Sequence, residues 1–346
     1  MTSTLWLSCH VHYACRHSGV CCTAGWPLPV EDTVVPAIDD AVTRGRLTTI
    51  DGRTAWLLES AEAPPGMAGT LRQRDGACVF HRPRAGAPPE SASHECAVHA
   101  TLGYAALPST CQHFPRVALI DDRGVRVSLS HVCPTALDLL ASQAGPVTIV
   151  PGPSAVPGRE TPEGLDARGE LPPALNDRVL MDLETLTLWE AHVVETLAGP
   201  DAVEAAIDDV VAALMHQASV LAAWTPRRGS LAESTREILA RPLALARVSS
   251  SPGAAERTHA RVAATCRPPW TWAPSPDLVP VLDAWWVEAE RGAFSPLIRR
   301  YLATRAFGAW AQYQAGGLVA SASWLRTVLD VLRVEAARAA AAAGRP

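Results

Sequence analysis

Alternating apolar and polar residues predict two β-hairpins in the first third of the chain. Residues 117–120 and 125–129 alternate around Asp122-Arg123-Gly124, which is the period of a half-buried strand. A comparable pattern covers residues 47–58 around Asp51-Gly52, and Asp-Gly is a favoured two-residue hairpin turn. Both segments are therefore expected to be hairpins.

The apolar period changes to that of a helix in the second half of the chain. Three stretches show this spacing: Val179 to Leu197, Val203 to Leu221, and Leu318 to Leu332. Ser230 with Glu233 forms a capping box, and Asp201 with Glu204 is an analogue of one. This half is therefore predicted to be a bundle of helices.

A crowded Pro- and Gly-rich segment separates the two patterns and predicts a domain boundary. We expect a cysteine-rich, metal-binding domain over 1–144, a linker over 145–176 and a helical domain over 177–340. The predicted fold class is α+β and mostly α, with a small irregular and hairpin domain followed by a bundle-like one.

Composition narrows the classes of function. The chain has 346 residues, 48% of them hydrophobic, which is enough for a substantial core. A net charge of -5 with 19% charged residues gives no electrostatic argument for nucleic acid or a membrane surface as partner. All 30 basic residues are arginine, as expected from a GC-rich genome. No apolar run is long enough for a membrane span, and Met1–Val20 lacks the features of a secretory signal. A cytoplasmic location is therefore expected.

Cysteine is the most informative residue type. Eight of the nine cysteines precede residue 134, namely Cys9, Cys15, Cys21, Cys22, Cys78, Cys96, Cys111 and Cys133. Structural disulfides are rare in a reducing compartment, so the cluster predicts metal binding rather than disulfides or simple packing. Thiolates hold zinc or iron–sulfur clusters, usually four per site. Two four-cysteine sites, or one site with further structural thiols, are both compatible. The ninth, Cys266, is interpreted as a buried or loop thiol.

Histidine is concentrated in the same region. Eight of eleven lie there: His10, His12, His17, His81, His94, His99, His113 and His131. Each is either a ligand, a neighbour of a ligand, or a solvated loop residue. His113 and His131 are the strongest candidates, because each lies two residues from a cysteine. The hairpin at 117–129 is expected to bring Cys111 and Cys133 close together.

Three local motifs resemble a known family. Cys21-Cys22-Thr-Ala-Gly25-Trp26 resembles a CC-x-GW element with one residue added, and Cys96 to Arg116 resembles a Cys…LG…L…TC-x-x-(F/Y)PR stretch. Ser128 to Pro134 resembles an SLS-x-x-CP element. These elements are similar to the zinc- or iron-chelating cysteine-cluster (CxxxCC, YkgJ-like) proteins, and within them to the flagellin lysine-N-methylase branch. The similarity covers residues 9–137.

The resemblance implies a cytoplasmic enzyme that carries an iron–sulfur cluster, with zinc as the alternative. Such an enzyme transfers methyl from S-adenosylmethionine to lysines of a protein substrate such as a surface-filament subunit. The chain departs from the family where Cys9, Cys15 and Cys21 are spaced more widely, which leaves a mixed Cys/His site open. It also lacks a glycine-rich nucleotide-binding turn.

Lysine methylation requires a neutral amine, so an aromatic or carboxylate group is expected beside it. Tyr104, Asp121 and Asp122 are the catalytic candidates, against the simpler roles of packing and turn formation. A substrate groove is an alternative to core packing for Trp270, Trp272, Trp285, Trp286, Trp310 and Trp324. The competing functional hypotheses are a non-enzymatic zinc- or iron-binding module and a secreted disulfide protein.

Overall fold

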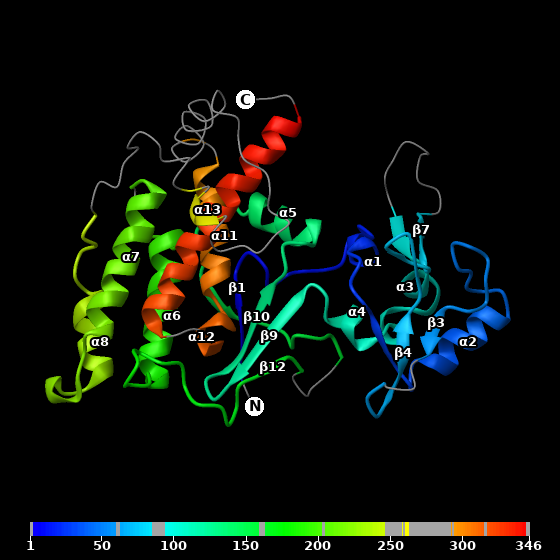
Figure 1. The fold of residues 1–346 in the computed structure, drawn as a ribbon, viewed down its shortest axis with the longest axis horizontal. Helices are drawn as coiled ribbons and strands as arrows, with labels where there is room; N and C mark the ends of the chain where they lie inside the picture. Colours follow the sequence, from blue (N-terminus) through cyan, green and yellow to red (C-terminus); the bar gives the residue numbers. More distant parts are fainter. Residues whose placement is uncertain are drawn as a thin grey trace.

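The fold has a small lobe and a helical lobe on either side of a central hairpin (Figure 1). A computed structural model describes residues 3–59, 63–84, 94–158, 163–202, 205–245, 258, 260–262, 292, 294–314 and 317–343. The α+β, mostly helical class predicted from the sequence is confirmed. Cys266 and the tryptophans at 270, 272, 285 and 286 lie outside the described residues.

The central sheet is built around the predicted hairpin at 117–129, which is confirmed. Strands β9 (Arg116–Asp121) and β10 (Gly124–Leu129) pair antiparallel from Gly124 opposite Asp121 to Leu129 opposite Arg116. Strand β1 (Thr4–Leu7) runs parallel to β10 on its other edge. Because β10 has neighbours on both sides, nearly all of its residues are buried.

The segment predicted to be a linker completes this sheet. Strand β11 (Ile149–Pro151) pairs with β1, and β12 (Leu165–Asp166) pairs with β9. The resulting order is β11-β1-β10-β9-β12, with α5 (Pro134–Ser142) following the hairpin. The predicted domain boundaries themselves stay a prediction.

The small lobe consists of short strands and short helices. Its elements are α1 (Val20–Thr23), β2 (Pro29–Glu31), α2 (Val35–Thr43), β3 (Leu57–Glu59), β4 (Met67–Leu71), β5 (Gln73–Arg74), β6 (Ala77–Cys78), β7 (His81–Pro83), β8 (His94–Cys96), α3 (Ala97–Leu102), η1 (Tyr104–Ala106) and α4 (Ser109–His113). Its core contains Val30, Ile38, Trp56, Phe80 and Leu107, together with several of the cysteines.

The hairpin predicted over 47–58 is wrong. A turn does form at Gly52, whose φ is +70°, but β3 pairs with β4 and not with the residues before the turn. The carboxylate of Asp51 instead accepts two hydrogen bonds from the Arg72 guanidinium, at 2.6 and 2.8 Å. The side chain at this turn is thus engaged in a long-range bidentate ion pair, and the strand after the turn pairs with β4.

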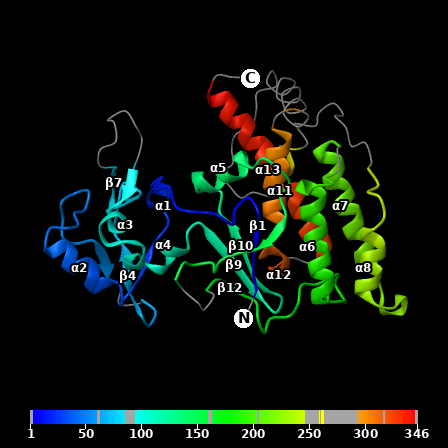
Figure 2. The ribbon, with the colours of Figure 1, turned by 180° about the vertical axis from the view of Figure 1, so that it is seen from behind.

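The helical lobe follows the predicted periodicity. It contains α6 (Leu183–Ala198), α7 (Ile207–Ala222), η2 (Pro226–Arg228), α8 (Leu231–Leu239), α11 (Ser295–Ala306), α12 (Ala311–Gln314) and α13 (Leu318–Ala342). In Figure 2 this bundle lies on the opposite side of the hairpin from the small lobe. Its core also takes in Leu7 and Cys9 from the N-terminal segment. Among the described residues, no helix combines the length and apolar character needed to cross a membrane.

The N-cap of one of the two predicted boxes is confirmed. The Ser230 hydroxyl accepts a hydrogen bond from the Glu233 backbone N–H at 3.3 Å. The prediction for Asp201 is wrong, because α7 begins only at Ile207. Helix α6 begins after Asp182, whose carboxylate accepts from the Thr185 N–H at 2.6 Å.

A buried network of charges joins the hairpin to the helical lobe. The Arg126 Nε lies 2.6 Å from a carboxylate oxygen of Glu190 on α6, and Arg123 Nη2 lies 2.7 Å from Asp121. Tyr313 on α12 donates to Asp121 at 2.7 Å. Glu190 and Asp121 are only 2% and 3% exposed. Because each charge has a partner, the network avoids the cost of an isolated buried ion.

Removal of one partner should therefore be costly. We expect Glu190→Ala to lower the free energy of unfolding by about 3–5 kcal/mol, because two buried guanidinium groups each lose one of their two carboxylate partners and keep only Asp121. Urea denaturation followed by circular dichroism measures this. The control is Glu237→Ala on the exposed face of α8, which should change stability by no more than about 0.5 kcal/mol. Equal effects of the two variants would contradict the role given to the network.

Candidate metal centre

Five of the eight predicted cysteine ligands converge in the small lobe. Cys22 Sγ lies 4.0 Å from Cys21 Sγ and also has hydrogen-bonding contacts with Cys78 and Cys96. Cys111 is within electrostatic reach of Cys21, Cys78 and Cys96. The five thiols come from α1, β6, β8 and α4. We call them the five-thiol group.

Backbone geometry at Gly19 brings α1 against the strands that carry the other thiols. Gly19 has a φ of +73°, which side chains on L-residues disfavour. A Cβ there would also lie 2.8 Å from His81 Nε2 and 2.9 Å from His94 Cβ. Glycine thus permits the close approach of α1 to β7 and β8, where His81 pairs with Cys96.

Helix α4 is tied to the same lobe by a carboxylate. Glu31 at the end of β2 accepts hydrogen bonds from the Ser109 N–H at 3.1 and 3.2 Å and from the Ser109 hydroxyl. Ser109 is the first residue of α4, where the helix dipole favours a negative charge. This contact holds Cys111, two residues later, beside the other thiols.

The thiols of the five-thiol group have different pKa values. The hydrogen bond from Cys22 lowers the pKa of Cys96 to about 7, and it also lowers the pKa of Cys21. The pKa of Cys22 is raised by its bonds to these neighbours and by burial. Burial, together with the charges of neighbouring thiolates, raises the pKa of Cys111. Cys21 and Cys96 are therefore the thiols that ionise first and would bind a metal first.

The shift at Cys96 can be measured directly in reduced, metal-free protein. Alkylation of Cys96 by iodoacetamide should be half-maximal near pH 7 and should fall as the pH drops below that value, because only the thiolate reacts. Mass spectrometry of the modified peptide follows the rate. In Cys22→Ala the midpoint should rise toward the ordinary thiol value of 9.0. An unchanged midpoint in that variant would contradict the proposed hydrogen bond.

The spacing of the sulfur atoms bears on which metal group fits. Among the described residues, no three sulfur atoms of the five-thiol group all lie within 4.8 Å of one another. Four thiolates on one zinc ion, at about 2.3 Å each, would be separated by only about 3.8 Å. An iron–sulfur cluster spreads its thiolates over several metal atoms. The soft donor set suits both groups, and the wide spacing favours the cluster.

The other three predicted cysteine ligands have different surroundings, although Cys15 is within electrostatic reach of one member of the group, Cys21. Cys9 is packed in the core of the helical lobe, where burial raises its pKa to about 12. Cys133 is buried, and Tyr13 Oη lies 3.7 Å from its sulfur. Cys15 is exposed and lies within electrostatic reach of both Cys21 and Cys133. The described interactions of Cys111 and Cys133 therefore place them with different neighbours, although both flank the hairpin.

The eight histidines divide into separate environments. His81 and His94 stack with ring centroids 4.5 Å apart, whereas His12 is exposed. His10 is fully buried, with its ring centroid 5.4 Å from that of His131. Burial lowers the pKa of His10 to about 4 and that of His131 to about 3. Both rings are therefore neutral at physiological pH.

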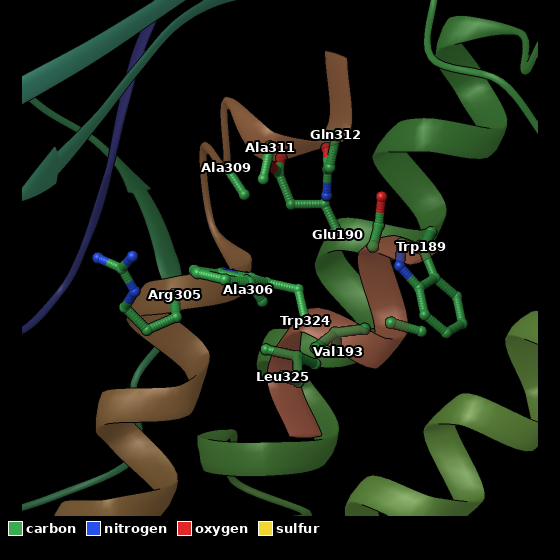
Figure 3. A pocket seen from close by; sticks show the side chains of 12 residues that line it. Trp189, Glu190, Val193, Arg305, Ala306, Ala309, Ala311, Gln312, Trp324 and Leu325 are labelled. Atoms are coloured by element: carbon green, nitrogen blue, oxygen red, sulfur yellow. The ribbon is translucent and has the colours of Figure 1, made fainter. Parts of the chain in front are cut away.

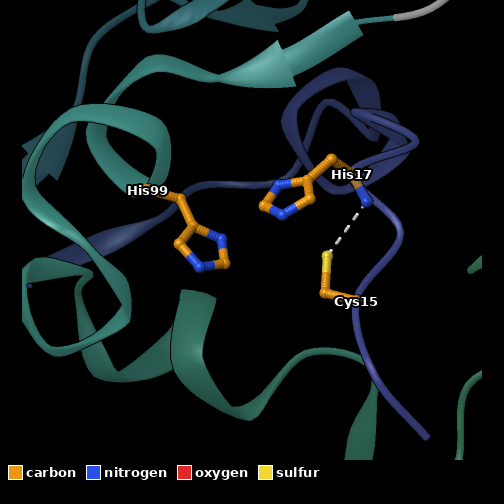
Figure 4. Close-up of side chains that lie close together, drawn as sticks. All are labelled: Cys15, His17 and His99. Atoms are coloured by element: carbon orange, nitrogen blue, oxygen red, sulfur yellow. Dashed lines mark hydrogen bonds between the residues drawn. The ribbon is translucent and has the colours of Figure 1, made fainter.

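A third pair of histidines lies with Cys15. One ligand atom from each of Cys15, His17 and His99 falls within 4.8 Å of the other two (Figure 4). Burial and the neighbouring His17 lower the pKa of His99. The remaining histidine, His113, lies beside a surface cleft.

The cleft adjoins the five-thiol group and has a volume of about 460 Å³. Cys21 and Cys111 form part of its wall. Trp26 and Phe114 contribute an aromatic pair with centroids 5.7 Å apart. The remaining lining residues are Leu28, Ser109, Thr110, His113, Pro115, Arg116, Val117, Ser130, Glu163 and Gly164.

Two polar residues of the cleft form a pair. His113 Nε2 lies 3.5 Å from a carboxylate oxygen of Glu163, and His113 Nδ1 lies 2.7 Å from the backbone oxygen of Ser109. Because a carbonyl oxygen can only accept, Nδ1 donates in this bond, and Nε2 faces the Glu163 carboxylate. The cleft thus combines aromatic surface, a carboxylate and an imidazole next to thiols.

The catalytic candidates predicted from the sequence do not line this cleft. The Tyr104 hydroxyl donates to the backbone oxygen of Gln112 at 2.6 Å. Asp121 belongs to the buried charge network, and Asp122 is exposed at the hairpin turn. That turn is separated from the Cys111 end by the length of β9, about 17 Å. Glu163 was missed, because an isolated acidic residue in a Pro- and Gly-rich segment has no distinguishing pattern.

Trp310 and Trp324 are the tryptophans of the predicted groove that lie within the described residues, and each has a different environment. Trp324, which is 38% exposed, lines a cavity of about 20 Å³ with Trp189, Arg305 and Gln312 (Figure 3). This volume is enough for about one water molecule. Trp310 packs instead against Tyr313, with ring centroids 5.7 Å apart.

Comparisons with models of protein families, with curated proteins and with solved structures found no match to this chain.

Proposed function

We propose that this protein binds an iron–sulfur cluster through the five-thiol group and acts as a protein-lysine N-methyltransferase at the adjoining cleft. The observation that supports it most is the convergence of five thiols from distant segments, two of which, Cys21 and Cys111, line a cleft that also holds aromatic and acidic side chains. Zinc is the alternative metal. We place the protein in the cytoplasm, where such thiols remain reduced.

The cleft has the groups that methylation of a lysine side chain requires. Trp26 and Phe114 offer apolar faces that strip water from the aliphatic stem and attract a cationic ε-ammonium. Glu163 attracts the same charge, and the His113 Nε2 beside it accepts a proton from the ammonium. S-adenosylmethionine supplies the electrophilic methyl group. The amine lone pair forms the new N–C bond as the S–C bond breaks, and the nitrogen then releases its second proton.

A non-enzymatic metal-binding module is the second candidate. It is supported by the position of the thiols within the small-lobe core, where Cys22 and Cys78 are buried among Val30 and Phe80. A metal there would stabilise the lobe whether or not the cleft is catalytic. The two candidates agree about the metal and differ about the cleft.

The first experiment tests the metal. Protein purified without oxygen should contain iron and acid-labile sulfide and should absorb near the visible charge-transfer bands of a cluster. Cys96→Ala and Cys111→Ala should lose most of the iron. Cys9→Ala, a matched change in the helical core, should keep it. Colourless protein with stoichiometric zinc and no iron would exclude the cluster.

The second experiment tests the cleft. The protein is incubated with radiolabelled S-adenosylmethionine and candidate protein substrates, beginning with surface-filament subunits. Because the chain contains no lysine, methyl-lysine can come only from the partner protein. Glu163→Gln should reduce labelling by about 100-fold and leave the iron content unchanged. The control, Glu237→Gln at an exposed position, should leave labelling unchanged. If cluster-loaded protein neither binds S-adenosylmethionine nor labels a substrate, the methyltransferase proposal is excluded and the non-enzymatic metal-binding module remains.

A further inference from the structure

We propose that Cys15, His17 and His99 form a second metal site, which binds one divalent ion of the zinc class with a coordination position left open. This site goes beyond the proposed function, because none of its three residues belongs to the five-thiol group and its metal is a different one. The proposal rests on the arrangement of the three side chains.

The three ligand atoms already lie close together. One atom each from the Cys15 thiol and the two imidazoles is within 4.8 Å of the other two, and the described residues hold no other such group. The rings of His17 and His99 have centroids 4.6 Å apart and are tilted by 47°. Figure 4 shows the side chains approaching one another from two separate segments. Ligand atoms on tetrahedral zinc are about 3.3–3.8 Å apart, so small rotations would complete the site.

The backbone positions two of the ligands on one tight turn. His17 has a φ of +57°, a left-handed conformation that is uncommon outside glycine. This turn directs the His17 N–H to the Cys15 sulfur, at 3.4 Å. A hydrogen bond of this kind supports a thiolate ligand. The left-handed conformation therefore favours metal binding, because it brings the Cys15 and His17 side chains close to each other.

The third ligand comes from a rigid element. His99 lies in the middle of α3 (Ala97–Leu102), which begins directly after Cys96. Its ring contacts Tyr104 edge-on, with centroids 5.9 Å apart, which limits the directions in which it can turn. The site therefore joins the N-terminal segment to the helix that follows a thiol of the five-thiol group.

The donor set selects the class of metal. One thiolate and two imidazoles suit zinc and similar borderline-soft ions, whereas magnesium and calcium require oxygen ligands. Three protein ligands leave the fourth tetrahedral position for water or an incoming ligand. Cys15 is exposed, so this position is accessible to solvent and the ion can exchange. A structural zinc site would instead be closed by four protein ligands.

The test uses the full chain with its iron centre loaded first. Zinc is then titrated, and the bound metal is examined at the zinc K-edge, which is insensitive to iron. We expect one equivalent of zinc with about one sulfur and two nitrogen ligands. His17→Asn, which tolerates the left-handed backbone, and His99→Gln should each weaken zinc binding by about 10-fold or more. Exposed His12→Asn is the control and should bind zinc as the wild type does.

The outcomes separate this proposal from the proposed function. Loss of iron in Cys15→Ser, with zinc binding unaffected by the histidine variants, would assign Cys15 to the first centre and overturn the second site. A sulfur-rich zinc edge would do the same. If the wild type holds no iron, the titration is repeated in Cys22→Ser/Cys96→Ser, which disrupts the five-thiol group. One-sulfur, two-nitrogen zinc in that variant would support the second site alone, and no zinc would overturn it. Circular dichroism verifies that each variant is folded.

Discussion

The structure depends on a buried set of charges at the closed end of its central hairpin. Arg123 and Arg126 extend from β10 and its turn to Glu190 on α6, and Asp121 accepts a hydrogen bond from Tyr313 on α12. Charges so deeply buried are tolerated only as a set, since each would be costly alone. The set therefore ties the hairpin to α6 and α12.

The open end of the same hairpin leads into the thiols. Helix α4 with Cys111 enters β9, and Cys133 follows β10 at the start of α5. Strand β1 pairs with β10 and continues into the segment that holds Cys9, Cys15, Cys21 and Cys22. The buried charges thus hold the turn end of the hairpin in place, and the opposite end of the same sheet connects to the segments that carry the cysteines. Such preorganisation lowers the entropy cost of collecting ligands from distant segments.

The thiols and the cleft adjoin each other. Cys21 and Cys111 belong both to the five-thiol group and to the wall of the cleft. A cofactor bound there would lie next to whatever occupies the cleft, and its charge would act on Glu163 and His113. The Cys15, His17 and His99 site lies near the same group, since Cys15 is within electrostatic reach of Cys21. The cysteines and histidines of the first third of the chain are therefore divided among several neighbouring groups of side chains.

Local patterns in the sequence were enough to predict the hairpin at 117–129, the helices of the second half and the Ser230 cap, because their partners are only a few residues apart. The abundance of cysteine was likewise enough to predict a thiol-rich centre. Which thiols meet was decided by the tertiary structure, since Cys22 and Cys96 are brought together by the packing of α1 against β7 and β8. Long-range contacts also distinguish the Asp51-Gly52 segment, where Asp51 pairs with Arg72, and they place Glu163 in the cleft. Contacts between residues far apart in the chain have no local period, and only the folded chain determines them.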